Sequence, residues 1–284
     1  MRQSTVLRDD WCPMAHEHPE MPDNEQTPTI DTSVPHSARI WNYWLGGKDN
    51  FPSDQAAGDE IRQVFPAIVE DARAVRAFLN RAVRHLAGTA GVRQFLDVGT
   101  GLPTVNNTHE VAQSVAPECR VVYVDNDPLV LAHARALLVG SPAGTTAYID
   151  ADLRDPESIL QGAAEILSFD EPIALILMGI LGHITDNEEA RGIVHRLMDT
   201  LPPGSYLVIS DLTNEVNGEA VDKAIRYWNE NSSNPRVNRT PDEIARFFDG
   251  LEVLEPGVVS SSLWRPEITG PPPVDDFGAV GYKP

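Results

Sequence analysis

Acidic residues and glycines directly follow three apolar runs in this chain, and their types suit the binding of a nucleoside. The first segment is Phe95–Gly101 (FLDVGTG), in which a buried strand is expected to lead into a Gly-x-Gly turn. Because glycine carries no Cβ, its backbone amide can approach a ligand closely. The turn at Gly99–Gly101 is therefore predicted to cradle a ligand.

The second segment is the run Val121–Asp125, whose acid stands 26 residues beyond Gly99. Nucleotide-binding sheets place an acid at the end of the second strand after about 20 residues, where its carboxylate accepts hydrogen bonds from ribose hydroxyls. Asp125 is therefore the strongest single ligand candidate, with Asn126 beside it. The alternative is that residues 125–127 only form a turn that caps the next helix.

The third segment is Ala151-Asp152-Leu153, just after an apolar run that ends at Ile149. Asp152 is suited to accept a hydrogen bond from the exocyclic amine of an adenine, while the Leu153 amide donates to a ring nitrogen. The alternative is a loop of solvated charges. The carboxyl ends of parallel strands share one crevice, so the three segments together predict a single site.

An NAD(P)-dependent oxidoreductase is the rival enzyme hypothesis, since the same strand, turn and acid could serve it. The dinucleotide fingerprint has a third glycine three residues after the second. Thr104 stands at that position. The missing glycine counts against dinucleotide binding.

The elements that must position these residues alternate between β-rich and helical stretches. Five strands are expected, at Gln94–Val98, Arg120–Asp125, Thr145–Ile149, Ile173–Met178 and Tyr206–Ser210. Helices between them are expected to begin near Thr108, Leu129, Pro156 and Glu188. This alternation predicts an α/β fold, a Rossmann-like doubly wound sheet that is mostly parallel.

The segments before and after these strands and helices also have recognisable sequence patterns. Residues 1–34 are predicted to be a disordered tail, and residues 35–90 an aromatic and helical cap in which Pro66 separates two helices. Residues 91–284 are predicted to form the main domain. Beyond the fifth strand we expect a helix around Val221–Glu230, a helix cap at Thr240, and an edge hairpin of Glu252–Ser262 with Gly278–Lys283.

Composition restricts the partners and the location. With 22 basic and 42 acidic residues the formal charge is -20, which disfavours nucleic acid and anionic membrane surfaces. Cys12 and Cys119 show neither a metal-ligand nor a disulfide spacing, so no metal site is expected and the cytoplasm fits. The longest apolar run, Ile173–Leu181, is roughly half the ~20 residues of a membrane span.

The chain resembles class I methyltransferases that depend on S-adenosyl-L-methionine. More closely, it resembles an actinobacterial S-adenosyl methyltransferase family formerly catalogued as a domain of unknown function. The matching segments are Arg39–Phe51, Gly99–Thr104, Val122–Pro128, Ala151–Pro156 and Trp264–Pro266. Two positions depart from the family's pattern, because Val75 stands where Asn is frequent and Gly182 where His is frequent.

The resemblance implies a seven-stranded sheet whose last strand is antiparallel, and S-adenosyl-L-methionine as cofactor with S-adenosyl-L-homocysteine as product. It implies that Arg39 and Tyr43 of the cap close over the cofactor. The methionyl carboxylate is expected at the helix start near Thr104–Thr108. The expected cofactor contacts are Arg39, Tyr43, Asp97, Gly99, Thr100, Gly101, Asp125, Asn126, Asp152, Leu153 and Met178.

The methyl acceptor is not identified by the sequence, although the acidity favours a small molecule. Acceptor-side candidates are His183, Asp211, Tyr43, Asn214, Trp41 and Trp44, each with a structural alternative. Methyl transfer depends on positioning and needs no dedicated catalytic dyad, so no catalytic residue is assigned. A non-catalytic protein that only binds S-adenosylmethionine is the alternative from another class, because a fold does not prove turnover. The oligomeric state is open.

Overall fold

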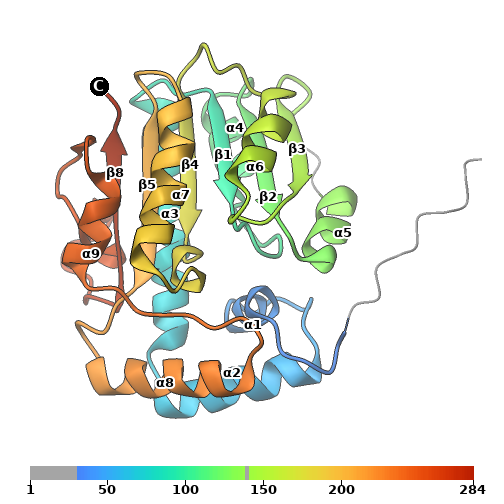
Figure 1. Cartoon of the computed structure of the whole chain (residues 1–284), viewed down its shortest axis with the longest axis vertical. Helices are drawn as coiled ribbons and strands as arrows, with labels where there is room; N and C mark the ends of the chain where they lie inside the picture. The colour runs from blue at the N-terminus through green and yellow to red at the C-terminus, as the bar shows by residue number, and fades with distance from the viewer. Residues whose placement is uncertain (1–30, 138–140) are drawn as a thin grey trace, which may run out of the picture.

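The computed structural model describes residues 31–137 and 141–284, which form one sheet with helices on both faces (Figure 1). The strands are β1 (Gln94–Val98), β2 (Arg120–Asp125), β3 (Thr145–Asp150), β4 (Ile173–Met178), β5 (Tyr206–Leu212), β6 (Glu252–Val253), β7 (Val259–Ser260) and β8 (Asp276–Tyr282). Their order is β3-β2-β1-β4-β5-β8-β6, with the short β7 beside β8. The expected parallel strands and the antiparallel last strand are confirmed.

The predicted closing pair of antiparallel segments at the edge of the sheet is confirmed, with β6 as the outermost strand and β8 inside it. β8 pairs with β5 on one side and with β6 and β7 on the other. Gly278 helps it to fit there, because a Cβ on this residue would lie 2.5 Å from the carbonyl oxygen of Ile209. The apolar pattern of the final segment is the same for an inner and an edge strand, so the sequence left open which of the two predicted segments would be outermost.

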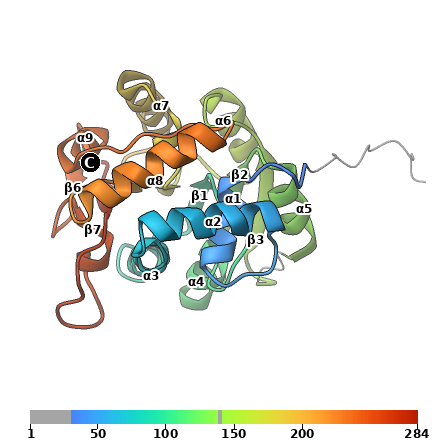
Figure 2. The same cartoon turned by 90° about the horizontal axis from the view of Figure 1, so that it is seen from below.

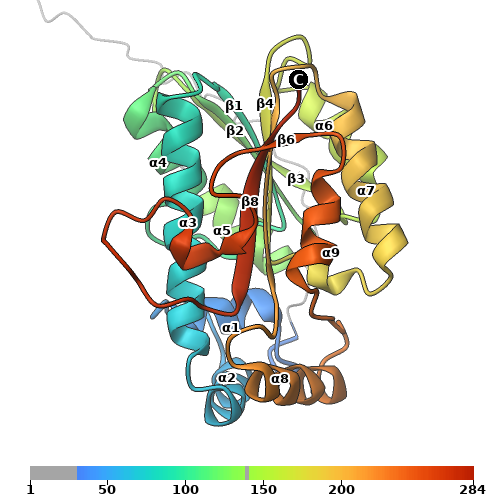
Figure 3. The same cartoon turned by 90° about the vertical axis from the view of Figure 1, so that its left-hand side faces the viewer.

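Helices cover both faces of the sheet (Figure 3). One face carries α3 (Ile68–Gly88) and α4 (Thr108–Val115), and the other α6 (Pro156–Ala164), α7 (Asn187–Thr200) and α9 (Pro241–Ala245). Helix α5 (Pro128–Leu137) lies beside β3. Side chains of β1 alternate accordingly, since Phe95 packs under α3 and Leu96 under α6 and α7. Short 3-10 turns follow β4, α9 and β7 at Leu181–His183, Arg246–Phe248 and Ser261–Leu263.

Three helices lie across the carboxyl ends of the parallel strands (Figures 1 and 2). We call α1 (Ser37–Trp44), α2 (Pro52–Val64) and α8 (Gly218–Asn231) the cap helices. They share a core that contains Ile40 and Trp228. Helix α3 joins this core to the sheet, because Ala72 packs with the cap helices and Phe78 with the sheet. The break at Pro66 is confirmed.

The predicted division into residues 1–34, 35–90 and 91–284 stays a prediction. Most of the expected tail lies outside the described residues. Within residues 31–137 and 141–284, every helix is too short or too polar to cross a lipid bilayer.

Candidate functional site

The turn after β1 has the backbone conformation that its glycines predict. Gly99 and Gly101 have φ angles of +74° and +66°, in the left-handed region that other residues rarely adopt. A Cβ on Gly99 would lie 2.6 Å from Cγ1 of Ile180. A Cβ on Gly101 would have only the Cβ of Ala38 within 4 Å, at 3.8 Å. Gly99 is therefore required by packing, whereas Gly101 faces open space.

Asp125 connects the end of β2 to this turn. Its Oδ2 accepts a hydrogen bond from the Gly101 amide at 2.8 Å, and its Oδ1 from the Asp127 amide at 3.0 Å. Burial raises the pKa of Asp125, and these two hydrogen bonds oppose that rise. Asp127 performs the capping that was the alternative for this segment, since its Oδ1 accepts from the Leu129 amide at 2.8 Å. Asp125 is thus left to face the glycine turn.

Asp97 and Arg76 bring opposite charges to the same place. Asp97 is only 4% exposed, and its Oδ2 accepts from the Thr108 hydroxyl at 2.6 Å. Burial raises the pKa of Asp97 to about 6, while Thr108 and the charge of Arg76 lower it. Arg76 reaches over from α3 and donates to the carbonyl oxygen of Asn106 at 3.2 Å. An acid and a guanidinium together match the ammonium and carboxylate of an amino acid.

Arg76 was not among the predicted site residues. It follows Val75 inside the amphipathic pattern, where any polar residue would equally well face solvent. Only the packing of α3 against the sheet turns it toward Asp97.

These groups line a crevice of about 990 Å³, part of it open to solvent, between α1 and the ends of β1, β2 and β4. It contains seven of the predicted contacts: Asp97, Gly99, Thr100, Gly101, Asp125, Asn126 and Met178. An adjoining hollow of about 420 Å³ is lined by Asp152 and Leu153 and shares Gly99, Asp125, Asn126, Ile180 and His183 with the crevice. The three predicted segments therefore meet, as strand-end placement implied.

The third segment offers a donor beside an acceptor. Asp152 accepts from the Arg154 amide at 2.8 Å and from Nδ2 of Asn126 at 3.0 Å. The backbone N–H of Leu153 has no hydrogen-bond partner among the described residues, while its side chain is buried. This arrangement suits the edge of a purine, and the adenine contact itself stays a prediction.

The structure places two of the predicted contacts outside both the crevice and the adjoining hollow. Arg39 donates from Nε to Oδ1 of the buried Asp54 at 3.0 Å and lies over the ring of Phe51. The Tyr43 hydroxyl donates to Oδ1 of Asp59 at 2.8 Å. The positions of Arg39 and Tyr43 along α1 turn their side chains away from the crevice and toward α2. Their contacts with Asp54 and Asp59 therefore hold α1 against α2. The α1 residues that line it are Ser37, Ala38, Trp41 and Asn42.

Of the acceptor-side candidates, His183 lines both hollows and Asp211 lines neither. Burial and the charge of Arg236 lower the pKa of His183 to about 3, so its ring is neutral at pH 7 and weakly basic. Asp211 is fully buried, with Oδ2 at 3.2 Å from Arg239 Nη1 and Oδ1 at 3.4 Å from Arg236 Nη2. Asp211 therefore serves as an internal counter-ion. Asn214 is exposed and donates to Asp222.

Gly182, one of the two departures, makes room for that ion pair. A Cβ at this position would lie 3.0 Å from both Oδ1 of Asp211 and Nη2 of Arg236. Among residues 31–137 and 141–284, no group of three or more His, Cys, Asp or Glu is placed to hold a metal ion.

Comparisons with known proteins extend over the cap helices and the sheet. A family model described as S-adenosyl methyltransferase matches residues 23–283. A DUF574 family protein from Streptomyces avermitilis MA-4680 is 46% identical, with a TM-score of 0.87 over 90% of this chain and 100% of that one. A Thermobifida fusca YX protein, provisionally named a methyltransferase, is 43% identical, with a TM-score of 0.82 over 89% and 96%. A search of curated proteins found no match.

Proposed function

The chain belongs to the S-adenosyl methyltransferase family, and we propose that it transfers the methyl group of S-adenosyl-L-methionine to a small-molecule acceptor. The family resemblance and the cofactor expected from the sequence are confirmed. The observation that carries the proposal is the meeting of Asp97, the glycine turn and Asp125 in one crevice. The net charge of -20 supports a small molecule over a polynucleotide. Cys119, a buried free thiol, supports a reducing compartment, and we propose the cytoplasm.

The residues of the crevice fit the cofactor from one end to the other. Asp97 and Arg76 suit its ammonium and carboxylate groups, Asp125 suits the ribose hydroxyls, and the hollow at Asp152 and Leu153 suits the adenine. These contacts reach the cofactor through amides, carboxylates and a guanidinium that are already positioned by the fold. When bound, the cofactor supplies an electrophilic methyl group on a sulfonium.

The chain's own contribution is to position the reactants. Holding a nucleophile in line at near-attack distance supplies much of the rate of such a transfer. Trp41 and Ser37 of α1 line the crevice. His183 stands at its wall as a neutral ring that can accept or donate a hydrogen bond but carries no charge.

The first test is a calorimetric titration with S-adenosylmethionine, S-adenosylhomocysteine and NAD in parallel. We expect the two adenosyl ligands to bind and NAD not to bind. Ligand at 100 times its Kd adds about 2.7 kcal/mol to the free energy of unfolding, which raises Tm by roughly 5 to 11 degrees. Binding of NAD alone would favour an oxidoreductase. Binding of S-adenosylmethionine without turnover on a broad acceptor panel would favour a non-catalytic protein.

Affinity for S-adenosylhomocysteine is expected to fall by about tenfold between pH 7 and pH 5. Burial raises the pKa of Asp97 to about 6 in the free protein. A bound ammonium group favours the ionised carboxylate, so binding below pH 6 must displace a proton from it. Titrations across this range measure the effect, and Asp97→Asn should flatten the profile. An unchanged slope in that variant would assign the titration to another group, such as Asp125.

A further inference from the structure

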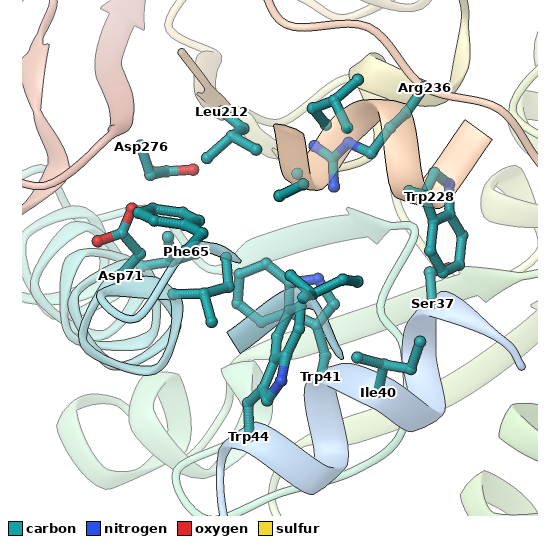
Figure 4. A pocket seen from close by; sticks show the side chains of 16 residues that line it. Ser37, Ile40, Trp41, Trp44, Phe65, Asp71, Leu212, Trp228, Arg236 and Asp276 are labelled. Atoms are coloured by element: carbon teal, nitrogen blue, oxygen red, sulfur yellow. The ribbon is translucent and has the colours of Figure 1, made fainter. Parts of the chain in front are cut away.

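A second chamber adjoins the crevice beneath the cap helices (Figure 4). Its volume is about 660 Å³, part of it open to solvent. Its walls are aromatic and aliphatic, formed mainly by Ile40, Trp41, Trp44, Phe65 and Trp228. Ser37, Trp41, Val75 and Gly179 line both cavities, so the chamber lies directly beside the crevice.

Two buried carboxyl groups stand together at one end of this chamber, and the Arg236 side chain extends into the chamber from another wall (Figure 4). Asp71 is 2% exposed, and its Oδ2 accepts from the Asp275 amide at 3.0 Å. Asp276 is 4% exposed, and its Oδ2 accepts from the Ser210 hydroxyl at 3.3 Å. The Oδ1 atom of Asp71 has no hydrogen-bond partner among the described residues, whereas a hydrogen bond from the Ser261 side chain lowers the pKa of Asp276. Buried acceptors of this kind are costly unless a donor meets them.

The charges favour a cationic donor at this end. Asp71, Asp211 and Asp276 are three carboxyls set against two guanidinium groups, those of Arg236 and Arg239. Both guanidinium groups pair with Asp211, and within the described part of the chain no cation lies within 4.0 Å of Asp71 or Asp276. Burial raises the pKa of Asp71 to about 7 and that of Asp276 far above its usual value. A bound cation would lower both values.

The acids also lie close to the crevice. Asp71 is one helical turn before Val75, which lines both cavities. Ser210, which donates to Asp276, is the register partner of Met178 in the neighbouring strand, and Met178 lines the crevice. A group held by the two acids therefore stands beside the crevice in which the cofactor is proposed to bind.

We propose that this chamber binds the methyl acceptor, and that the acceptor is an organic amine with an aromatic or similarly bulky apolar body. The proposal rests on the methyltransferase function proposed above. The nitrogen is held by Asp71 and Asp276, while the body packs against the tryptophans of the chamber, whose faces also attract a cation. No residue of the chamber is required to form a covalent bond.

The proton and electron balance is simple. The Asp71 carboxylate takes a proton from the ammonium group, which frees the nitrogen lone pair. The lone pair forms the new C–N bond, and the S–CH3 bond breaks with its electron pair left on sulfur. The methylated ammonium product remains paired with Asp276, and the proton on Asp71 passes to solvent.

Three matched probes test the chemistry: phenethylamine, 2-phenylethanol and 3-phenylpropionate. Each is titrated calorimetrically into protein saturated with S-adenosylhomocysteine. We expect phenethylamine to bind at least about tenfold more tightly than the alcohol, and the carboxylate not to bind, because only the amine pairs with both acids. Equal or tighter binding of the alcohol or the carboxylate overturns the proposal, as does no binding of phenethylamine at millimolar concentration.

Variants locate the site. Asp71→Asn and Asp276→Asn should each remove the preference for phenethylamine while Tm and S-adenosylhomocysteine affinity are kept. Glu230→Gln is the matched control, since it removes one acid at the exposed end of α8 and should change nothing. Retained preference in both aspartate variants contradicts the assignment. Failure of the unmodified protein to bind S-adenosylhomocysteine would contradict the proposed function instead, so the two failures are distinguishable.

Discussion

Asp125→Ala is expected to weaken binding of S-adenosylmethionine and S-adenosylhomocysteine by about a hundredfold or more. A carboxylate that accepts from two ribose hydroxyls makes two charge-assisted hydrogen bonds, each of about 1.5 to 3 kcal/mol. The same carboxylate accepts from the amides of Gly101 and Asp127, so the variant also releases the glycine turn. Calorimetric titration with S-adenosylhomocysteine measures the loss.

Asp150→Ala is the matched control for this variant. Asp150 is the register partner of Asp125 on β3, it is exposed, and it lines neither hollow. Its removal takes away one strand-end acid and should leave the affinity unchanged. If the Asp125→Ala protein binds S-adenosylhomocysteine as tightly as the Asp150→Ala protein does, the assignment of Asp125 to the ribose is wrong.

Gly99→Ala is expected to lower the free energy of unfolding by about 3 kcal/mol, because it combines left-handed strain with overpacking. The φ angle of +74° disfavours any side chain, and the new Cβ would lie 2.6 Å from Cγ1 and 2.7 Å from Cβ of Ile180. Ile180 cannot withdraw by rotating its side chain alone, since its own Cβ is involved. Thermal and denaturant unfolding measure the change.

Gly101→Ala separates the effect of left-handed backbone strain from the effect of overpacking. Its φ angle of +66° imposes a similar strain, but the nearest atom to its Cβ is 3.8 Å away. We expect a loss of only about 1 to 2 kcal/mol. Equal destabilisation by both variants would show that packing against Ile180 contributes nothing. Gly101→Val, which extends into the crevice, should reduce S-adenosylhomocysteine affinity with little further loss of stability.

Site residues at strand ends were predictable from the sequence, because the end of a strand fixes where in the sheet its last residue lies. Asp125 and Asp152 each end or follow an apolar run, and the carboxyl ends of parallel strands share one crevice whatever the details of packing. The β1 turn was predictable for the same reason, with Gly99 and Gly101 marking its backbone.

Residues on helices were not predictable in this way. Arg39 and Tyr43 belong to a specific motif, but which side of α1 faces the crevice depends on how the helix is rotated about its axis. That rotation is set by contacts such as Arg39 with Asp54. Arg76 shows the opposite case, an ordinary polar position that packing brings into the site. The chamber acids Asp71 and Asp276 lie far apart in the sequence, on α3 and β8, and no local pattern relates them.

Ser37 and Trp41 line both the crevice and the chamber, and this has a thermodynamic consequence. A ligand that orders these two side chains in one cavity spares the ligand of the other cavity that entropy cost. Linkage makes the benefit reciprocal, so each ligand would raise the affinity of the other by the same factor. The two ligands would then bind cooperatively, and α1 would be the element that couples binding in one cavity to binding in the other.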